Sequence, residues 1–186
     1  GTDTFVFGTS GVHLKEVNFT FFDDFTLLAN AAVPSLAFNS QFSYRISVDG
    51  GATFSVEQAA TASFTVSLGT PVGNDYAFQI TQLTISGGDL PAGFQLRRGA
   101  AGPAAVVTFT PNTPSPGLFA IDNTFYLKLD LSQNGGTTWT ASDLMLGFVL
   151  APLTQEELTQ SPTLPPGDAT YYTPDEYHAK FASGIV

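Results

Sequence analysis

The chain has 186 residues, of which 43% are hydrophobic and 13% aromatic, enough to bury a core as one large β domain or two small ones. With 16 acidic and 6 basic residues the formal net charge is -10, which excludes nucleic-acid binding, because that depends on Lys and Arg at the phosphates. Anionic membrane surfaces are disfavoured too, no stretch approaches the ~20 apolar residues of a membrane span, and the absence of cysteine excludes disulfides and thiolate chemistry.

The predicted elements are β-strands separated by Gly and Pro. Apolar residues alternate with polar ones from residue 4 to residue 150, and no convincing helical period appears before residue 152. This pattern is typical of an all-β fold, an antiparallel β-sandwich of the jelly-roll or Ig-like kind. In chain order the predicted strands lie at 4–7, 12–14, 17–21, 36–48, 54–56, 64–68, 76–85, 94–96, 106–109, 125–131 and 144–150.

The last part of the chain has a different composition. Residues 154–157 form a capping-box pattern that predicts one helical turn, and the prolines of 161–167 predict an extended linker. A second capping box, Thr173 to Glu176 with Pro174 at the first helical position, predicts a short helix. We therefore expect an N-terminal strand or donor segment at 1–11, a β-sandwich domain at 12–152, and a Pro-rich C-terminal arm with short helices at 153–186.

Two turns carry the same motif. Ser47-Val48-Asp49-Gly50-Gly51-Ala52-Thr53-Phe54 follows one alternating strand, and Ser132-Gln133-Asn134-Gly135-Gly136-Thr137-Thr138-Trp139 follows another. Both resemble the Asp-box hairpin of sialidase-type propellers and some other extracellular β folds, and no protein family is identified from them. The resemblance implies a structural role in which the carboxylate or amide binds local backbone and the aromatic packs beneath the turn. The motif residues are Ser47, Asp49, Gly51, Phe54, Ser132, Asn134, Gly136 and Trp139. Chance convergence and an internal duplication both explain the pair.

Few residues show a pattern that indicates chemistry. His13 and His178 have no metal-ligand spacing, so both are expected to be packed or solvent-facing. Asp23-Asp24 and Asp122-Asn123 are each half of a Ca²⁺ site or a turn, because the calcium loop with its distal Glu is missing. A pair of acids for glycoside hydrolysis stays open, since nothing in the sequence singles one out. We predict no enzyme activity, no catalytic or metal-binding residue and no cofactor.

Two short motifs have competing interpretations. Arg97-Arg98, the only adjacent basic pair, marks either an inter-subunit contact or a charged sheet edge that discourages aggregation. Asn18-Phe19-Thr20 is a glycosylation sequon, but it lies in a predicted strand, so we do not expect modification there.

The apolar N-terminal segment suggests a function. Phe5, Val6 and Phe7 form a β-favouring strand that either closes its own sheet or adds to a neighbour's sheet. We expect an extracellular or cell-surface structural subunit that assembles with copies of itself into a filament or layer through this strand. The alternative is a carbohydrate-binding or adhesive module that binds neutral glycans, with Trp139 as candidate contact. A third possibility is a viral capsid or decoration protein.

Overall fold

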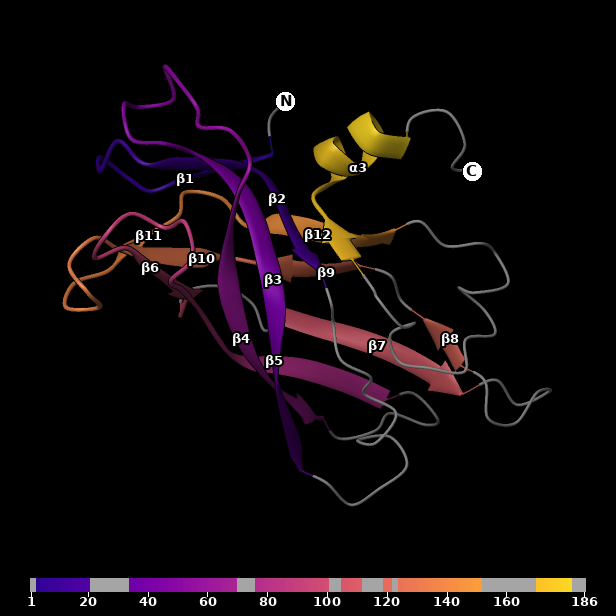
Figure 1. Cartoon of the computed structure of the whole chain (residues 1–186). Coiled ribbons are helices and arrows are strands. Elements are labelled where there is room, and N and C mark those ends of the chain that lie inside the picture. Colours follow the sequence, from indigo (N-terminus) through magenta and orange to yellow (C-terminus); the bar gives the residue numbers. More distant parts are fainter. Residues whose placement is uncertain are drawn as a thin grey trace.

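The computed structural model describes residues 3–20, 34–69, 76–100, 105–111, 119–121, 124–151 and 170–181. Their strands pair only in antiparallel fashion and form one curled sheet (Figure 1). The all-β antiparallel prediction with one short helix is confirmed, whereas the division into two facing sheets of a sandwich stays a prediction. The elements are β1 (Thr4–Val6), β2 (His13–Thr20), β3 (Ser35–Ser47), β4 (Gln58–Leu68), β5 (Tyr76–Ser86), β6 (Gln95–Arg98), β7 (Ala105–Pro111), β8 (Phe119–Ile121), β9 (Thr124–Leu127), β10 (Leu129–Ser132), β11 (Thr140–Ala141), β12 (Leu146–Ala151), β13 (Thr170–Tyr172) and α3 (Pro174–Phe181).

The sheet begins and ends on the same stretch of chain. Its strand order is β11-β10-β6-β5-β4-β3-β2-β13-β12-β9, with β1 beside β2, and β7 and β8 beside β5. Only Lys128 separates β9 from β10, yet β9 pairs with β12 and β10 with β6. The single strand predicted at 125–131 is therefore two strands, because the chain changes partners at Lys128 as the sheet curls.

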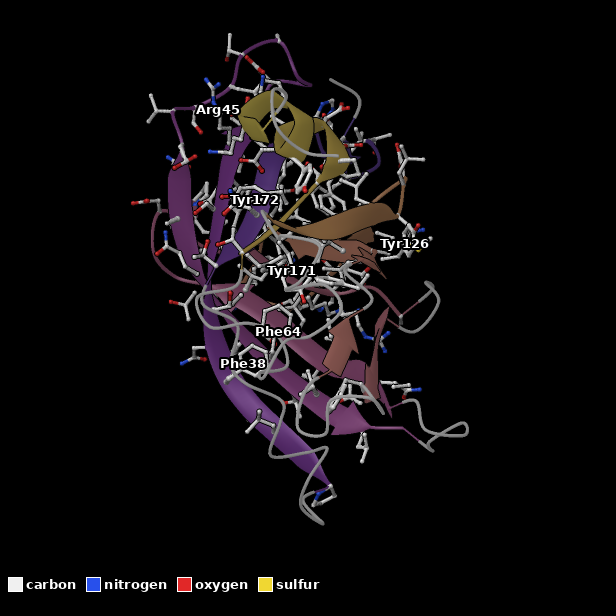
Figure 2. The ribbon with its side chains drawn as sticks, turned by 90° about the vertical axis from the view of Figure 1, so that its right-hand side faces the viewer. Phe38, Arg45, Phe64, Tyr126, Tyr171 and Tyr172 are labelled. Atoms are coloured by element: carbon white, nitrogen blue, oxygen red, sulfur yellow. The ribbon has the colours of Figure 1, made fainter. Side chains whose placement is uncertain are left out.

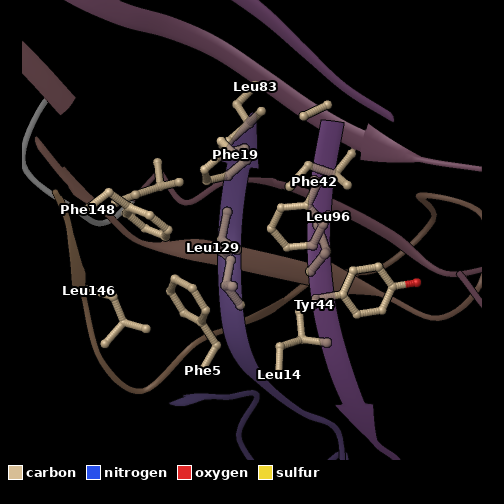
Figure 3. Close-up of a cluster of buried hydrophobic side chains, with 14 of the residues drawn as sticks. Phe5, Leu14, Phe19, Phe42, Tyr44, Leu83, Leu96, Leu129, Leu146 and Phe148 are labelled. Atoms are coloured by element: carbon tan, nitrogen blue, oxygen red, sulfur yellow. The ribbon is translucent and has the colours of Figure 1, made fainter. Parts of the chain in front are cut away.

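The interior of the curled sheet is filled by aromatic rings. The ring centroid of Phe19 lies 5.1 Å from that of Phe42, 5.3 Å from Phe64 and 5.2 Å from Phe148. Figure 3 shows Phe5, Phe19, Phe42 and Phe148 pointing into one cluster with the leucines of neighbouring strands. Such buried ring pairs contribute about 0.5–1.5 kcal/mol each beyond their buried area, and the buried Phe side chains of the described strands make up much of the core.

The N-terminal strand lies in the sheet of its own chain. Phe5 of β1 pairs with Leu14 of β2, and the side chains of Phe5 and Phe7 are fully buried. A tight turn joins the strands, with Phe7 N–H donating to Val12 O at 3.2 Å, and Val6 O accepts from Asp143 N–H at 2.8 Å. Assembly through Phe5, Val6 and Phe7 stays a prediction, and it requires this hairpin to open.

One edge of β2 is shared by two short strands. Residues 13–15 pair with β1 and residues 18–20 pair with β13, so β1 and β13 lie end to end along β2. The register of β2 with β3 shifts between them, where Glu16 has a φ of 52°. A left-handed backbone at a non-glycine residue is uncommon. Beside this bulge Val17 O accepts from Thr173 N–H at 3.4 Å, just before α3 begins.

The start of α3 differs from the predicted capping box. The helix begins at Pro174, but the Thr173 hydroxyl is buried and has no hydrogen-bond partner in the described part of the chain. The Glu176 carboxylate accepts a hydrogen bond from Asn18 Nδ2 at 3.1 Å instead of turning back to residue 173. Asn18 is therefore buried and bonded, and a glycan on its amide would have no space. The reciprocal box is wrong because β2 offers Glu176 a stronger partner.

Other predictions need correction or fall outside the structure. Residues 54–56 form no strand, since the chain loops out before β4 begins at Gln58. Strand β6, which carries Arg97 and Arg98, pairs with β5 and β10 and so is not a sheet edge. Outside the described residues lie Asp23-Asp24, Asp122-Asn123, the helical turn at 154–157, the linker at 161–167 and the side chain of His178.

Candidate functional site

Both Asp-box turns are held by the same hydrogen bonds. Ser47 Oγ donates to Asp49 Oδ1 at 2.6 Å and accepts from Gly51 N–H at 2.9 Å. Asp49 Oδ1 also accepts from Thr53 N–H at 2.9 Å, and Oδ2 accepts from the Thr53 hydroxyl at 2.6 Å. These hydrogen bonds, first from Ser47 and then from Thr53, lower the pKa of the Asp49 carboxyl.

The second turn repeats this network with an amide. Ser132 Oγ donates to Asn134 Oδ1 at 3.0 Å and accepts from Gly136 N–H at 2.8 Å. Asn134 Oδ1 accepts from Thr138 N–H at 2.9 Å, while its Nδ2 donates to the Thr138 hydroxyl at 2.8 Å. An Asn can replace an Asp here because the hydroxyl can act as donor or acceptor.

The two box turns also make the same contact with a neighbouring loop, because each donates a hydrogen bond to a glycine that lies just before a strand. Gly50 N–H donates to Gly11 O at 2.9 Å, and Gly135 N–H donates to Gly93 O at 2.8 Å. All four glycines have positive φ, which other residues adopt only with strain. The fold therefore repeats a unit made of a glycine turn, a strand and a box hairpin, although this does not separate duplication from convergence.

A cation covers the aromatic ring of each box. Lys15 Nζ lies 4.3 Å from the Phe54 ring centroid, and the Arg97 guanidinium carbon lies 4.2 Å from that of Trp139. Arg97 Nε also donates to Asp130 Oδ2 at 3.1 Å, and Trp139 Nε1 donates to Gly136 O at 3.1 Å. The indole N–H is thus bonded within the turn, Arg97 of β6 covers the ring, and the Trp139 side chain is partly buried.

The outward face of β3, β4 and β5 differs from an ordinary protein surface. Residues 35–43, 58–68 and 76–86 contain no Asp, Glu, Lys, Arg or His. Sheet faces open to water usually carry charged side chains, which keep the protein soluble and prevent non-specific pairing. Figure 2 shows side chains projecting into solvent along the purple strands of this face. We call this surface the neutral face, and its exposed hydroxyl and amide side chains are Asn39, Gln41, Thr61, Ser63, Gln79, Thr81, Gln82 and Ser86.

Cross-strand register brings these side chains into rows. Asn39 pairs with Ser63, and Ser63 pairs with Thr84, which in turn pairs with Arg97 of β6. The row therefore runs across four strands toward the Arg97–Trp139 contact. Ser63 Oγ donates to Asn39 Oδ1 at 2.9 Å, which leaves the Asn39 amide nitrogen to face solvent. Hydroxyls and amides both donate and accept, so the row can match ligand hydroxyls.

Two shallow hollows lie on the neutral face. One of about 360 Å³ is lined by residues of all three strands, including Ser63 and Gln82, and another of about 470 Å³ includes Gln41 and Thr61. Asn39 lines both hollows, so they adjoin. An adjoining pair of open, uncharged hollows suits an extended ligand better than a compact one.

The neutral face was not among the sequence-predicted sites, which named only Trp139 as a glycan contact. The available signal was that the predicted strands at 36–48, 64–68 and 76–85 alternate apolar and polar residues with Arg45 as their one charged residue. Within the described ranges no group of three His, Asp or Glu side chains is arranged to hold a metal ion. No helix in the same residues is long and apolar enough to cross a membrane.

Comparisons with models of protein families, with curated proteins and with solved structures found no match to this chain.

Proposed function

We propose that the chain is an extracellular, non-catalytic adhesive module whose neutral face binds neutral polysaccharide. The observation that carries this proposal is the row of hydroxyl and amide side chains across β3, β4 and β5, with no charged residue in those strand segments. The proposal retains the predicted jelly-roll or Ig-like sandwich, with the neutral face as the outer surface of one sheet.

Charge is the main reason for choosing a neutral partner. The chain carries a formal net charge of -10, so an acidic polymer is repelled at long range and a basic one is attracted to acidic residues elsewhere. The neutral face offers neither kind of ion pair. A neutral polysaccharide presents hydroxyls along its length, and these can pair with Asn39, Ser63 and Gln82 without the cost of desolvating a charge.

The test is binding to a panel of neutral polysaccharides, for example cellulose, starch, mannan and β-1,3-glucan, by co-sedimentation or affinity electrophoresis. Asn39→Arg should abolish binding, because Asn39 lines both hollows. Gln82→Glu should weaken binding, whereas Gln133→Glu makes the same change on an exposed residue away from the face. Added salt should have little effect, since no ion pair forms. No binding across the panel, or equal loss in both Glu variants, would contradict the proposal.

The second candidate is the self-assembling structural subunit, and one feature of β13 favours it. The three-residue β13 is inserted between β2 and β12, and Tyr171 packs edge-on against Phe125 with ring centroids 4.9 Å apart. The segment 170–181 is joined to β12 only through residues 152–169. A chain of that length spans tens of ångströms when extended, so the segment could complete a neighbouring copy's sheet instead.

Engineered disulfides can show whether β13 pairs with β2 of its own chain or with β2 of a neighbouring copy. The chain has no native cysteine that would interfere. Thr20→Cys with Thr170→Cys joins registered residues of β2 and β13. Gln41→Cys with Thr61→Cys is the matched control, since it joins β3 to β4 and stays within one chain. If β13 is exchanged between copies, the cysteine pair at 20 and 170 should give covalent multimers on non-reducing gels, and the pair at 41 and 61 should not. Monomers for both pairs would contradict this candidate.

A further inference from the structure

A pocket of about 460 Å³ lies where β1, the bulge of β2 and the start of α3 meet. It belongs to neither the neutral face nor the Asp-box turns. Figure 1 shows α3 lying above β2 near the N-terminal end of the chain. The lining residues used below are Asp3, Glu16, Thr173, Asp175, Glu176 and Lys180.

Two oxygen atoms of the lining are buried without a donor. The Glu176 side chain is only 4% exposed, and its Oε1 accepts from Asn18 Nδ2 at 3.1 Å. Its Oε2 has no hydrogen-bond partner among the described residues, and the same holds for the Thr173 hydroxyl. Buried polar atoms are nearly always hydrogen-bonded, and leaving one unsatisfied is unfavourable. The Glu176 oxygen can only accept and the Thr173 hydroxyl can also accept, so a donor group in the pocket would satisfy both.

The basic side chains around the pocket are already engaged. Lys180 Nζ lies 3.9 Å from Glu176 Oε1, on the side that Asn18 also serves. Glu16 is bridged by Lys15 at 3.8 Å and by Arg45 at 3.3 Å. These cations leave the second oxygen of Glu176 without a partner.

Two aspartates add negative charge at the mouth. Asp3 N–H donates to Asp175 Oδ2 at 3.2 Å, and Asp175 N–H donates to Asp3 Oδ2 at 2.5 Å. This exchange ties β1 to the first turn of α3 and brings both carboxylates to the pocket. Four carboxylates line the pocket against Lys15 and Lys180, so its net charge favours a cation.

We propose that this pocket binds a small primary ammonium ligand, whose N–H groups donate to Glu176 Oε2 and to the Thr173 hydroxyl. A directional donor fits better than a metal ion, because the described carboxylates do not form a metal-holding group. An alkyl chain on the ammonium group would lie in the remaining volume of the pocket.

Protonation of Glu176 couples this binding to pH. Desolvation raises the pKa of Glu176 to about 7; its hydrogen bond from Asn18 and the charge of Lys180 oppose the rise, and Glu16 and Glu57 add to it. An ammonium ligand favours the charged carboxylate. Binding should therefore strengthen as pH rises through about 7 and weaken at acid pH.

The probe is n-butylammonium, titrated into the intact chain and followed by NMR chemical shifts and calorimetry. Tetramethylammonium carries the same charge without N–H donors, and 1-butanol carries the alkyl chain without charge. We expect butylammonium to bind and both controls to bind about tenfold more weakly or not at all.

Substitutions locate the site. Glu176→Gln should weaken butylammonium binding about tenfold and remove its pH dependence, and Thr173→Val should weaken it while the pH dependence remains. Asp143→Asn is the control, since Asp143 is exposed, does not line the pocket and, unlike Glu57, is not one of the charges that shift the pKa of Glu176. Thermal unfolding confirms that each variant is folded. Absence of butylammonium binding, or unchanged affinity in Glu176→Gln, would overturn the proposal. Neither result depends on whether the neutral face binds polysaccharide.

Discussion

Replacing Glu176 by Gln should change how the stability of this protein depends on pH. Gln has the size of Glu and can still accept the hydrogen bond from Asn18, but it cannot become charged. In the native protein burial raises the pKa of Glu176 to about 7, so the folded chain holds this proton more tightly than the unfolded chain does. The contribution to stability is therefore complete below about pH 4.5 and is lost as pH rises through about 7.

The size of the effect follows from the shift. The rise in the pKa of Glu176 from 4.5 to about 7 limits the stability lost on ionisation to about 3 kcal/mol, at ~1.36 kcal/mol per pKa unit. The neighbouring pocket brings solvent close to the carboxylate, and screening by that solvent reduces the cost of its charge. We therefore expect Glu176→Gln to be more stable than the native chain by about 1–2 kcal/mol near pH 8, and about equally stable near pH 4, below the pKa of the unfolded chain.

Urea unfolding, followed by the fluorescence of Trp139, the only tryptophan, measures the free energy of unfolding of the native chain and of Glu176→Gln at each pH. Comparison of the two proteins at each pH removes the contributions of all other titrating groups. Asp143→Asn, on an exposed residue whose charge does not contribute to the raised pKa of Glu176, should follow the native pH curve. Parallel curves for Glu176→Gln and the native chain would refute the argument that a buried, half-satisfied carboxylate weakens the docking of α3.

Three further predictions test the core and the box turns. Phe5→Ala should lower the free energy of unfolding of the isolated monomer by about 3–5 kcal/mol, because Phe5 is fully buried in its own chain; an unchanged urea midpoint would contradict this placement. Asp49→Asn should leave the melting temperature nearly unchanged, since Asn134 makes the same bonds in the second turn, whereas Asp49→Ala should lower it. Arg97→Leu should shift the emission of Trp139, while Lys15→Leu should not; equal spectra for native chain and Arg97→Leu would argue against the ring contact.

Much of the fold could be predicted from local patterns. Alternation of apolar and polar residues identifies strands because successive side chains point to opposite faces, and Gly-rich turns mark hairpins because few residues adopt positive φ. Such signals act over a few residues and survive in any tertiary context. They predicted the all-β antiparallel class and the start of α3 at Pro174.

The candidate sites were less predictable, because they depend on register between distant strands. The absence of charge from β4, β5 and residues 35–43 of β3 can be read from the sequence, but the row from Asn39 to Arg97 exists only once four strands are aligned. The partner of Glu176 shows the same limit. The sequence pattern pairs Glu176 with Thr173, its neighbour in the chain. In the structure Glu176 instead accepts a hydrogen bond from Asn18, which is distant in the sequence.

By itself the sequence determined the antiparallel β class, the uncharged strands and the two box turns, because these follow from side-chain period, charge and local backbone preference. Tertiary structure alone decided that β1 completes its own sheet, that the chain changes partners at Lys128, and that Glu176 is buried beside a pocket. Each of these depends on how a curled sheet brings remote segments together. No local pattern of residues encodes that closure.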